Sequence, residues 1–137
     1  MKNKLILFLT IVLILNITWE FSHYQLYNDL SSITGTPHLI IASFTDVLWV
    51  FLIYSIVSIS RKNFSWINNP KKRDYILFVI LSLIVALLIE VINIKLGRWS
   101  YKESMPTIYG IGLSPLIQLA TTGVISLLIS KHNKHIR

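Results

Sequence analysis

The chain consists of long apolar stretches joined by short polar segments, and the apolar stretches are continuous rather than alternating. A helix needs about 20 mostly apolar residues to cross roughly 30 Å of hydrocarbon, and four stretches meet this requirement. They cover about residues 5–21, 38–59, 75–96 and 108–130. A membrane barrel would need short alternating segments instead. We therefore predict an all-α integral membrane protein, a bundle of four transmembrane helices that forms a single domain over residues 1–137.

The composition supports the membrane class and excludes several others. Of the 137 residues, 53% are hydrophobic and 14% are charged, and the mean hydropathy is +0.62. A water-facing surface cannot carry that many apolar side chains, and the length of one domain excludes a soluble multidomain enzyme. Because the chain has no cysteine, a disulfide scaffold and a cysteine-ligated metal site are also excluded. The aliphatic and aromatic content excludes a disordered chain.

The distribution of lysine and arginine predicts the orientation. Ten of the thirteen basic residues fall in the N-terminal tip, the connection 61–74 and the C-terminal tail, which four spans place on one side. The opposite side carries only Lys95, Arg98 and Lys102. The positive-inside rule then places both termini in the cytoplasm and predicts a multi-pass protein of the cell membrane. The net charge of +7 is thus explained by topology and by attraction to anionic headgroups, and we expect no nucleic-acid partner.

The first apolar stretch and the connection 61–74 each allow more than one interpretation. The first apolar stretch follows Lys2 and Lys4 as in a signal peptide, but no small-residue cleavage site comes after it, so we expect a retained helix. The connection 61–74 contains Trp66, an aromatic residue of the kind found at membrane interfaces, and we expect it to lie along the interface.

Each predicted helix carries polar or small side chains at spacings of three and four residues, which places them on one helix face. These faces comprise Asn16, Glu20 and His23 on the first helix, Ser43, Asp46 and Trp49 on the second, Ser82, Ala86, Glu90, Asn93 and Gly97 on the third, and Gly110, Ser114, Gln118 and Thr121 on the fourth. With a rise of about 1.5 Å per residue, Asp46 and Glu90 lie at similar depths in the outer half of the membrane. We therefore expect the four polar faces to meet.

Asp46 and Glu90 are the strongest candidates for chemistry. An ionisable group at membrane depth costs about 2.5–3.5 kcal/mol on insertion scales, so each one needs an explanation. A carboxyl group in a low-dielectric site suits general acid and base catalysis, and we predict these two residues as catalytic. Arg98 is the expected partner of one of them, because its long side chain lets the charge reach down from the interface. The alternative is a carboxylate–arginine pair that only holds the bundle together.

Other site types are not indicated. The sequence contains no phosphate-binding glycine loop, no His-Glu-x-x-His pair and no Gly-x-Ser-x-Gly elbow. The histidines of the first outer connection, His23 and His38, are a weak basis for a metal site. We therefore expect neither a metal nor a cofactor.

Several segments carry a resemblance to known proteins. They are Glu90 to Tyr101, Met105-Pro106 and Gly110 to Gln118, together with Trp19-Glu20 and Asp46. With these segments the chain resembles a group of small four-helix bacterial membrane proteins that are uncharacterised. The resemblance covers most of the chain and implies a four-helix fold, but no activity.

A looser resemblance is to the lycopene cyclase domain of carotenoid biosynthesis, a small all-helical membrane unit. Gly97-Arg98-Trp99-Ser100-Tyr101 is similar to its Gly-x-Trp-x-Tyr/Phe stretch, and Pro115-Leu116-Ile117-Gln118 stands where that family has a Pro-Leu-Glu-Glu-like motif. The likeness covers about a third of the chain. The family's acidic residues are replaced here by Ile117 and Gln118, so an acid that protonates a polyene would have to be Asp46 or Glu90. The resemblance implies a lipid-soluble substrate.

These observations lead to an expected function with two alternatives. We expect a membrane-embedded enzyme that acts on a lipid or isoprenoid by acid/base chemistry, with Asp46 and Glu90 as catalytic residues. The expected substrate-binding residues are Glu20, Asn93, Arg98, Trp99, Tyr101, Ser114 and Gln118. The alternatives are a non-catalytic assembly or binding subunit of a membrane complex, and an oligomeric transport or proton-relay component. The expected partners are membrane lipids, a lipid-soluble substrate, and a second copy of the chain or another membrane protein.

Overall fold

Four long helices dominate the structure, a computed structural model that describes residues 2–30 and 36–132. They are α1 (Lys2–His23), α2 (Thr36–Arg61), α3 (Lys72–Lys95) and α4 (Leu113–His132). All four are long and apolar enough to cross a membrane. The four predicted helices are therefore confirmed. The basic residues Lys134 and Arg137 of the predicted C-terminal tail lie outside the described residues.

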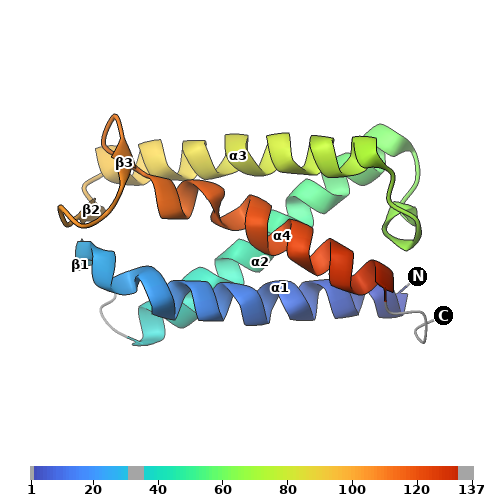
Figure 1. Ribbon diagram of the computed structural model, residues 1–137, viewed down its shortest axis with the longest axis horizontal. Coiled ribbons are helices and arrows are strands. Elements are labelled where there is room, and N and C mark those ends of the chain that lie inside the picture. Colours follow the sequence, from blue (N-terminus) through green and yellow to red (C-terminus); the bar gives the residue numbers. More distant parts are fainter. Residues whose placement is uncertain (1, 31–35, 133–137) are drawn as a thin grey trace.

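The helices are arranged as two outer helices and two that cross between them (Figure 1). Helices α1 and α3 run along opposite sides, while α2 and α4 pass diagonally from one side to the other. Helix α4 packs against both α1 and α3, and α2 packs mainly against α1. The start of α1, the end of α4 and the α2–α3 connection lie at one end of the bundle, and the strands lie at the other (Figure 1).

The fourth helix begins later than predicted, at Leu113 rather than near Ile108. Strands β3 (Thr107–Ile108) and β4 (Ile111–Gly112) form an antiparallel hairpin instead. Its two turn residues, Tyr109 and Gly110, have φ angles of 51° and 79°. Two consecutive left-handed residues are typical of a tight hairpin turn and cannot belong to a right-handed helix. The segment was mistaken for helix because its apolar character continues unbroken into α4.

A second pair of strands joins the two connections at this end of the bundle. Strand β1 (Tyr27–Leu30) follows the short 3₁₀ helix η1 (Tyr24–Leu26) and pairs antiparallel with β2 (Trp99–Tyr101). In this register Tyr27 lies opposite Tyr101. The backbone N–H of Lys102 donates to the Leu26 carbonyl at 2.9 Å. The ends of α1 and α3 are therefore held together by main-chain hydrogen bonds that the hydropathy pattern did not predict.

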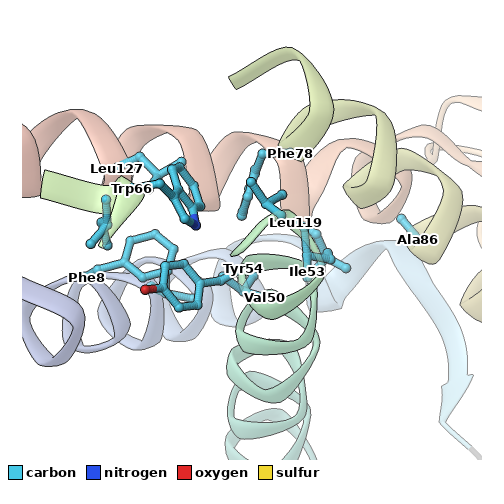
Figure 2. Close-up of a cluster of buried hydrophobic side chains, with 12 residues drawn as sticks. Phe8, Val50, Ile53, Tyr54, Trp66, Phe78, Ala86, Leu119 and Leu127 are labelled. Atoms are coloured by element: carbon cyan, nitrogen blue, oxygen red, sulfur yellow. The ribbon is translucent and has the colours of Figure 1, made fainter. Parts of the chain in front are cut away.

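The apolar core fills the opposite half of the bundle, where Phe8, Tyr54, Trp66, Phe78 and Leu127 converge from all four helices and the α2–α3 connection (Figure 2). Trp66 belongs to the 3₁₀ helix η2 (Trp66–Asn68), and its ring stacks on Tyr54 with centroids 5.4 Å apart. Only 1% of Trp66 is exposed. The expectation that this connection lies along an interface is therefore wrong for Trp66, which folds back because its indole N–H finds the Ser58 hydroxyl at 3.0 Å inside the bundle.

A buried ion pair closes the same end. One guanidinium nitrogen of Arg61, Nη1, donates to both carboxylate oxygens of Asp74, at 2.5 and 2.7 Å. The Lys71 backbone N–H donates to the same carboxylate at 2.8 Å and so begins α3 with a capping interaction. Asp74 is fully buried. These contacts fix the angle between α2 and α3, and leave the other half of the bundle to hold the polar residues.

Candidate functional site

A cavity of about 380 Å³ lies between the helices in the half of the bundle nearer the strands. All four helices contribute to its walls. Its polar lining comprises Glu20, His38, Thr45, Asp46, Glu90, Asn93, Arg98 and Gln118, and aromatic side chains include Tyr24, Tyr27, Trp49 and Trp99. Each helix thus contributes predicted polar residues to one cavity, but Ser114 and Thr121 of the predicted α4 face line a different hollow. Six of the nine predicted site residues contributed polar groups to this wall, and Trp99 also lines it.

The amide of Gln118 is the centre of the first polar cluster. Its nitrogen Nε2 lies 2.7 Å from Oδ2 of Asp46, 2.7 Å from Oε1 of Glu20 and 3.0 Å from Oδ1 of Asn16. An amide nitrogen carries only two hydrogens, so three acceptors compete for two donors. The contacts connect α1, α2 and α4 at one point.

Helical spacing explains how the cluster is built. Asn16 and Glu20 are one turn apart on α1, and Gln118 and Thr122 are one turn apart on α4, so each pair points to the same side. Asn16 completes the link by donating from Nδ2 to the Thr122 hydroxyl at 3.2 Å. Asn16, Gln118 and Thr122 are all buried. The sequence placed Asn16, Glu20 and Gln118 on these faces but predicted Thr121, whereas Thr122 is the threonine that joins the cluster. The crossing of α2 and α4 brings the faces together.

Glu90 belongs to a second cluster with different partners. The Tyr101 hydroxyl donates to its carboxyl oxygen Oε2, and the Trp99 indole N–H donates to the same hydroxyl at 3.1 Å. Only 2% of Glu90 is exposed. Glu90 is therefore a buried carboxyl group that receives a hydrogen bond from the strand β2.

The pKa values of Tyr101 and Tyr27, the two tyrosines beside Glu90, are raised. Burial raises the pKa of Tyr101 well above its ordinary value, and its hydrogen bond to Glu90 raises it further. Burial also raises the pKa of Tyr27, as do the neighbouring Tyr101, Glu90 and Glu20. Both phenols therefore stay protonated at neutral pH and can donate hydrogen bonds, as Tyr101 does to Glu90.

Arg98 has a different role from the one expected. Its guanidinium donates to the side-chain oxygen of Asn93 at 3.1 Å, and Asn93 in turn donates to the Ile89 carbonyl at 2.7 Å. Glu90 and Asp46 make their hydrogen bonds with Tyr101 and Gln118 instead. Arg98 follows the end of α3 and is exposed, and its side chain lines the cavity.

Two predicted site residues, Tyr101 and Ser114, do not line this cavity. Tyr101 still donates a hydrogen bond to Glu90. Ser114 lines a second hollow of about 340 Å³ between α1 and α4, which Thr18, Trp19, Ser22 and His23 also border.

His23, predicted only as part of the polar face of the first helix, and Tyr27, which was not predicted, lie beside the second cluster. Ring nitrogen Nε2 of His23 lies 3.3 Å from the Tyr27 hydroxyl, and Nδ1 lies 2.7 Å from the Trp19 carbonyl oxygen. The rings of Tyr27 and Tyr101 are 5.1 Å apart. One signal was present in the sequence. Asn16, Glu20, His23 and Tyr27 follow spacings of four, three and four, so the polar face of α1 continues beyond the helix end.

The arrangement offers two carboxyl sites with unlike surroundings. Glu20 and Asp46 share one amide nitrogen, whereas Glu90 receives the Tyr101 hydroxyl. Among residues 2–30 and 36–132, no group of three acidic or histidine side chains has the geometry of a metal site. Chemically, the cavity can hold and move protons next to an apolar ligand.

No protein-family model, curated protein or solved structure matches the chain.

Proposed function

We propose that the chain is a membrane-embedded enzyme that moves protons on an unsaturated isoprenoid or related lipid. One observation carries the proposal. Three carboxyl groups from three helices, Glu20, Asp46 and Glu90, line a single cavity of about 380 Å³. Pairs of carboxyl groups in different environments are the usual apparatus for acid and base catalysis.

The hydrogen bonds of the three carboxyl groups indicate which of them acts as the acid and which as the base. Glu20 and Asp46 approach the same amide nitrogen, and two neighbouring carboxyl groups repel each other when both are ionised. The pair therefore favours one shared proton, and Asp46 acts as the acid. Glu90 accepts the Tyr101 hydroxyl and acts as the base. Asp46 adds a proton to one carbon of a double bond, and Glu90 removes a proton from a neighbouring carbon of the resulting cation. The product is an isomer of the substrate, so no further reactant is needed.

The cavity walls support an apolar substrate. Leu39, Ile41, Ala86, Ile89 and Leu119 line the cavity between the carboxyl groups. Its volume is near the lower end of the roughly 300–1,000 Å³ range of ligand pockets, so it would receive one end of a long isoprenoid chain. Trp99 and Tyr101 flank this end, and Arg98 and Asn93 orient a polar group if the substrate has one. The isoprenoid class itself is suggested by the resemblance to the lycopene cyclase domain.

The proposal includes the cell membrane as the location, with both the N-terminus and the C-terminus of the chain in the cytoplasm. The support is the excess of basic residues at the end that holds the start of α1, the α2–α3 connection and the end of α4. Because the chain has no cysteine, single cysteines at Lys62 and Ser104 can report on the two ends. We expect a membrane-impermeant maleimide to label Ser104→Cys in intact cells and Lys62→Cys only after lysis. The reverse pattern would contradict the proposed orientation.

Deuterium transfer tests the activity directly. The protein is reconstituted in phospholipid nanodiscs in D₂O with squalene and lycopene as polyene probes, and the recovered lipids are analysed by mass spectrometry. We expect deuterium on carbon in a polyene, lost in Asp46→Asn and Glu90→Gln by about 10²-fold or more. Squalane, which has no double bond to protonate, should gain none.

Glu103→Gln is the matched control, because Glu103 is an exposed carboxyl outside the cavity. It should transfer deuterium at the wild-type rate. Equal transfer by wild type and Asp46→Asn would remove Asp46 from the mechanism. If neither probe gains deuterium, and the two cavity variants lose only stability or recovery of a bound protein, the non-catalytic alternative is favoured.

A further inference from the structure

A line of hydrogen-bonding side chains runs from Glu90 in the cavity to His23 at the end of α1. The Tyr101 hydroxyl donates to Glu90, and the rings of Tyr101 and Tyr27 are neighbours with centroids 5.1 Å apart. Nε2 of His23 lies 3.3 Å from the Tyr27 hydroxyl. The pairing of β1 with β2, which sets Tyr27 opposite Tyr101, holds the middle of this line in register.

The Trp19 carbonyl fixes one ring nitrogen of His23. A carbonyl oxygen only accepts hydrogen bonds, so Nδ1 at 2.7 Å must carry a hydrogen. Nε2 is then the nitrogen that gains or loses a proton, and it faces Tyr27. A neutral His23 accepts the hydrogen of Tyr27, and a charged His23 donates to it.

The Trp99 indole N–H constrains the hydrogen bonding of Tyr101 in a similar way. An indole nitrogen is only a donor, so its 3.1 Å contact uses a lone pair of the Tyr101 oxygen. The Tyr101 hydrogen is then free to point to Glu90 or to Tyr27. Each hydroxyl in the line can accept from one neighbour and donate to the other, as proton transfer along hydrogen bonds requires.

We propose that Tyr101, Tyr27 and His23 form a proton relay between Glu90 in the cavity and the hollow between α1 and α4. His23 borders that hollow. The proposal rests on the proposed function, because it gives the base Glu90 a way to lose the proton that it takes from the substrate. In the relay the three residues act through Glu90 and form no bond to the substrate's reacting carbons.

The transfer balances without another reactant. The O–H bond of protonated Glu90 breaks and its hydrogen forms a bond to the Tyr101 oxygen, while the Tyr101 hydrogen moves to Tyr27. The Tyr27 hydrogen moves to Nε2 of His23. Glu90 is left as a carboxylate and His23 as an imidazolium, with both tyrosines neutral. The imidazolium then releases its proton to water at the end of the bundle, and the reverse sequence protonates Glu90.

The rate at which Glu90 gains a proton measures the relay without any substrate. The chain has three glutamates, Glu20, Glu90 and Glu103, so ¹³C labelling of glutamate carboxyl carbons leaves few bands, and Glu90→Gln identifies the one of interest. The protein in phosphatidylcholine bilayers is followed by time-resolved infrared spectroscopy after a pH drop. We expect Tyr27→Phe and His23→Gln to slow protonation of Glu90 on the order of 10²-fold.

The variants separate a relay from a structural contact. Glutamine at position 23 can still donate to the Trp19 carbonyl, but its amide does not take up and release a proton. It therefore carries the test alone if Tyr27→Phe does not fold. His132→Gln is the matched histidine control, because Nδ1 of His132 makes the same type of contact to the Leu128 carbonyl at 2.9 Å, at the other end of the bundle. Tyr109→Phe is the tyrosine control, since Tyr109 is fully exposed.

The outcomes are distinct. Slow protonation in both relay variants, with wild-type rates in both controls, supports the relay. Wild-type rates in Tyr27→Phe and His23→Gln overturn it, and slowing in Tyr101→Phe alone would mean that protons enter at Tyr101 from the surface hollow that Tyr101, Lys102 and Glu103 line. A working relay in a protein that transfers no deuterium to polyenes would reject only the proposed function, and the converse result would reject only the relay.

Discussion

The amide nitrogen of Gln118 lies 2.7 Å from a carboxyl oxygen of Asp46, at the cavity to which all four helices contribute polar residues. The same nitrogen lies 2.7 Å from a carboxyl oxygen of Glu20. One side chain of α4 thus holds two acidic groups of α1 and α2 close together.

Replacing Gln118 with leucine should destabilise the bundle. The substitution removes the donor that Glu20 and Asp46 share, and interhelical hydrogen bonds in membrane proteins contribute about 0.6–2 kcal/mol each. We expect the free energy of unfolding to fall by about 1–2 kcal/mol, as measured by circular dichroism in mixed detergent micelles. Adding Asp46→Asn should restore part of the loss, because it removes one of the two acids. Gln25→Leu, at the chain's other glutamine, is exposed and should change nothing.

Asp74→Asn should have a larger effect on stability. The substitution removes the charge that pairs with Arg61 at 2.5 Å in a buried position, and breaking one partner of a buried pair costs about 3–5 kcal/mol. Unfolding in the same detergent series measures the loss. Glu103→Gln removes an exposed charge and should leave the transition in place. If both variants change the free energy of unfolding by an equally small amount, the Arg61–Asp74 ion pair does not stabilise the fold as proposed.

Gly123→Ala tests the packing between α3 and α4. A Cβ atom at this position would overlap the ring of Phe78, which is fully buried. Overpacking a filled core typically costs about 1–3 kcal/mol, and we expect a loss in that range. Phe78→Leu in the Gly123→Ala background should recover part of the loss, because the smaller side chain leaves room. Additive effects of the two substitutions would contradict the contact.

Stability should fall at high pH because of Tyr27 and Tyr101. Burial raises the pKa of both phenols in the folded protein, whereas an unfolded tyrosine ionises near pH 10. The folded state therefore binds more protons above that pH, and its stability is retained below about pH 10 and lost as the pH rises further. Unfolding free energy measured between about pH 9 and pH 12 should show this decline. Tyr101→Phe should flatten it, while Tyr109→Phe should not, since Tyr109 is exposed.

Some parts of the structure could be predicted from local sequence, and the failures have physical causes. Most predicted helix ends agree with the structure to within three residues. The start of α4 was placed five residues too early, because the hairpin around Tyr109 and Gly110 is as apolar as the helix that follows. Trp66 was assigned to an interface by residue type, although its indole finds a buried hydroxyl partner. In both cases the segment is as apolar as predicted. The conformation of the backbone decides where α4 starts, and a side-chain hydrogen bond decides where Trp66 lies.

The sequence by itself determined four membrane-length helices and a polar face on each, because apolar length and helical spacing are local properties of the chain. It also singled out Asp46 and Glu90, since carboxyl groups are rare in such segments. Only the tertiary structure decided that Asp46 meets Glu20 and Gln118 while Glu90 meets Tyr101, and that His23 and Tyr27 join the second group. These partners depend on how α2 and α4 cross and on the register of β1 with β2, which arise from packing between segments far apart in the chain.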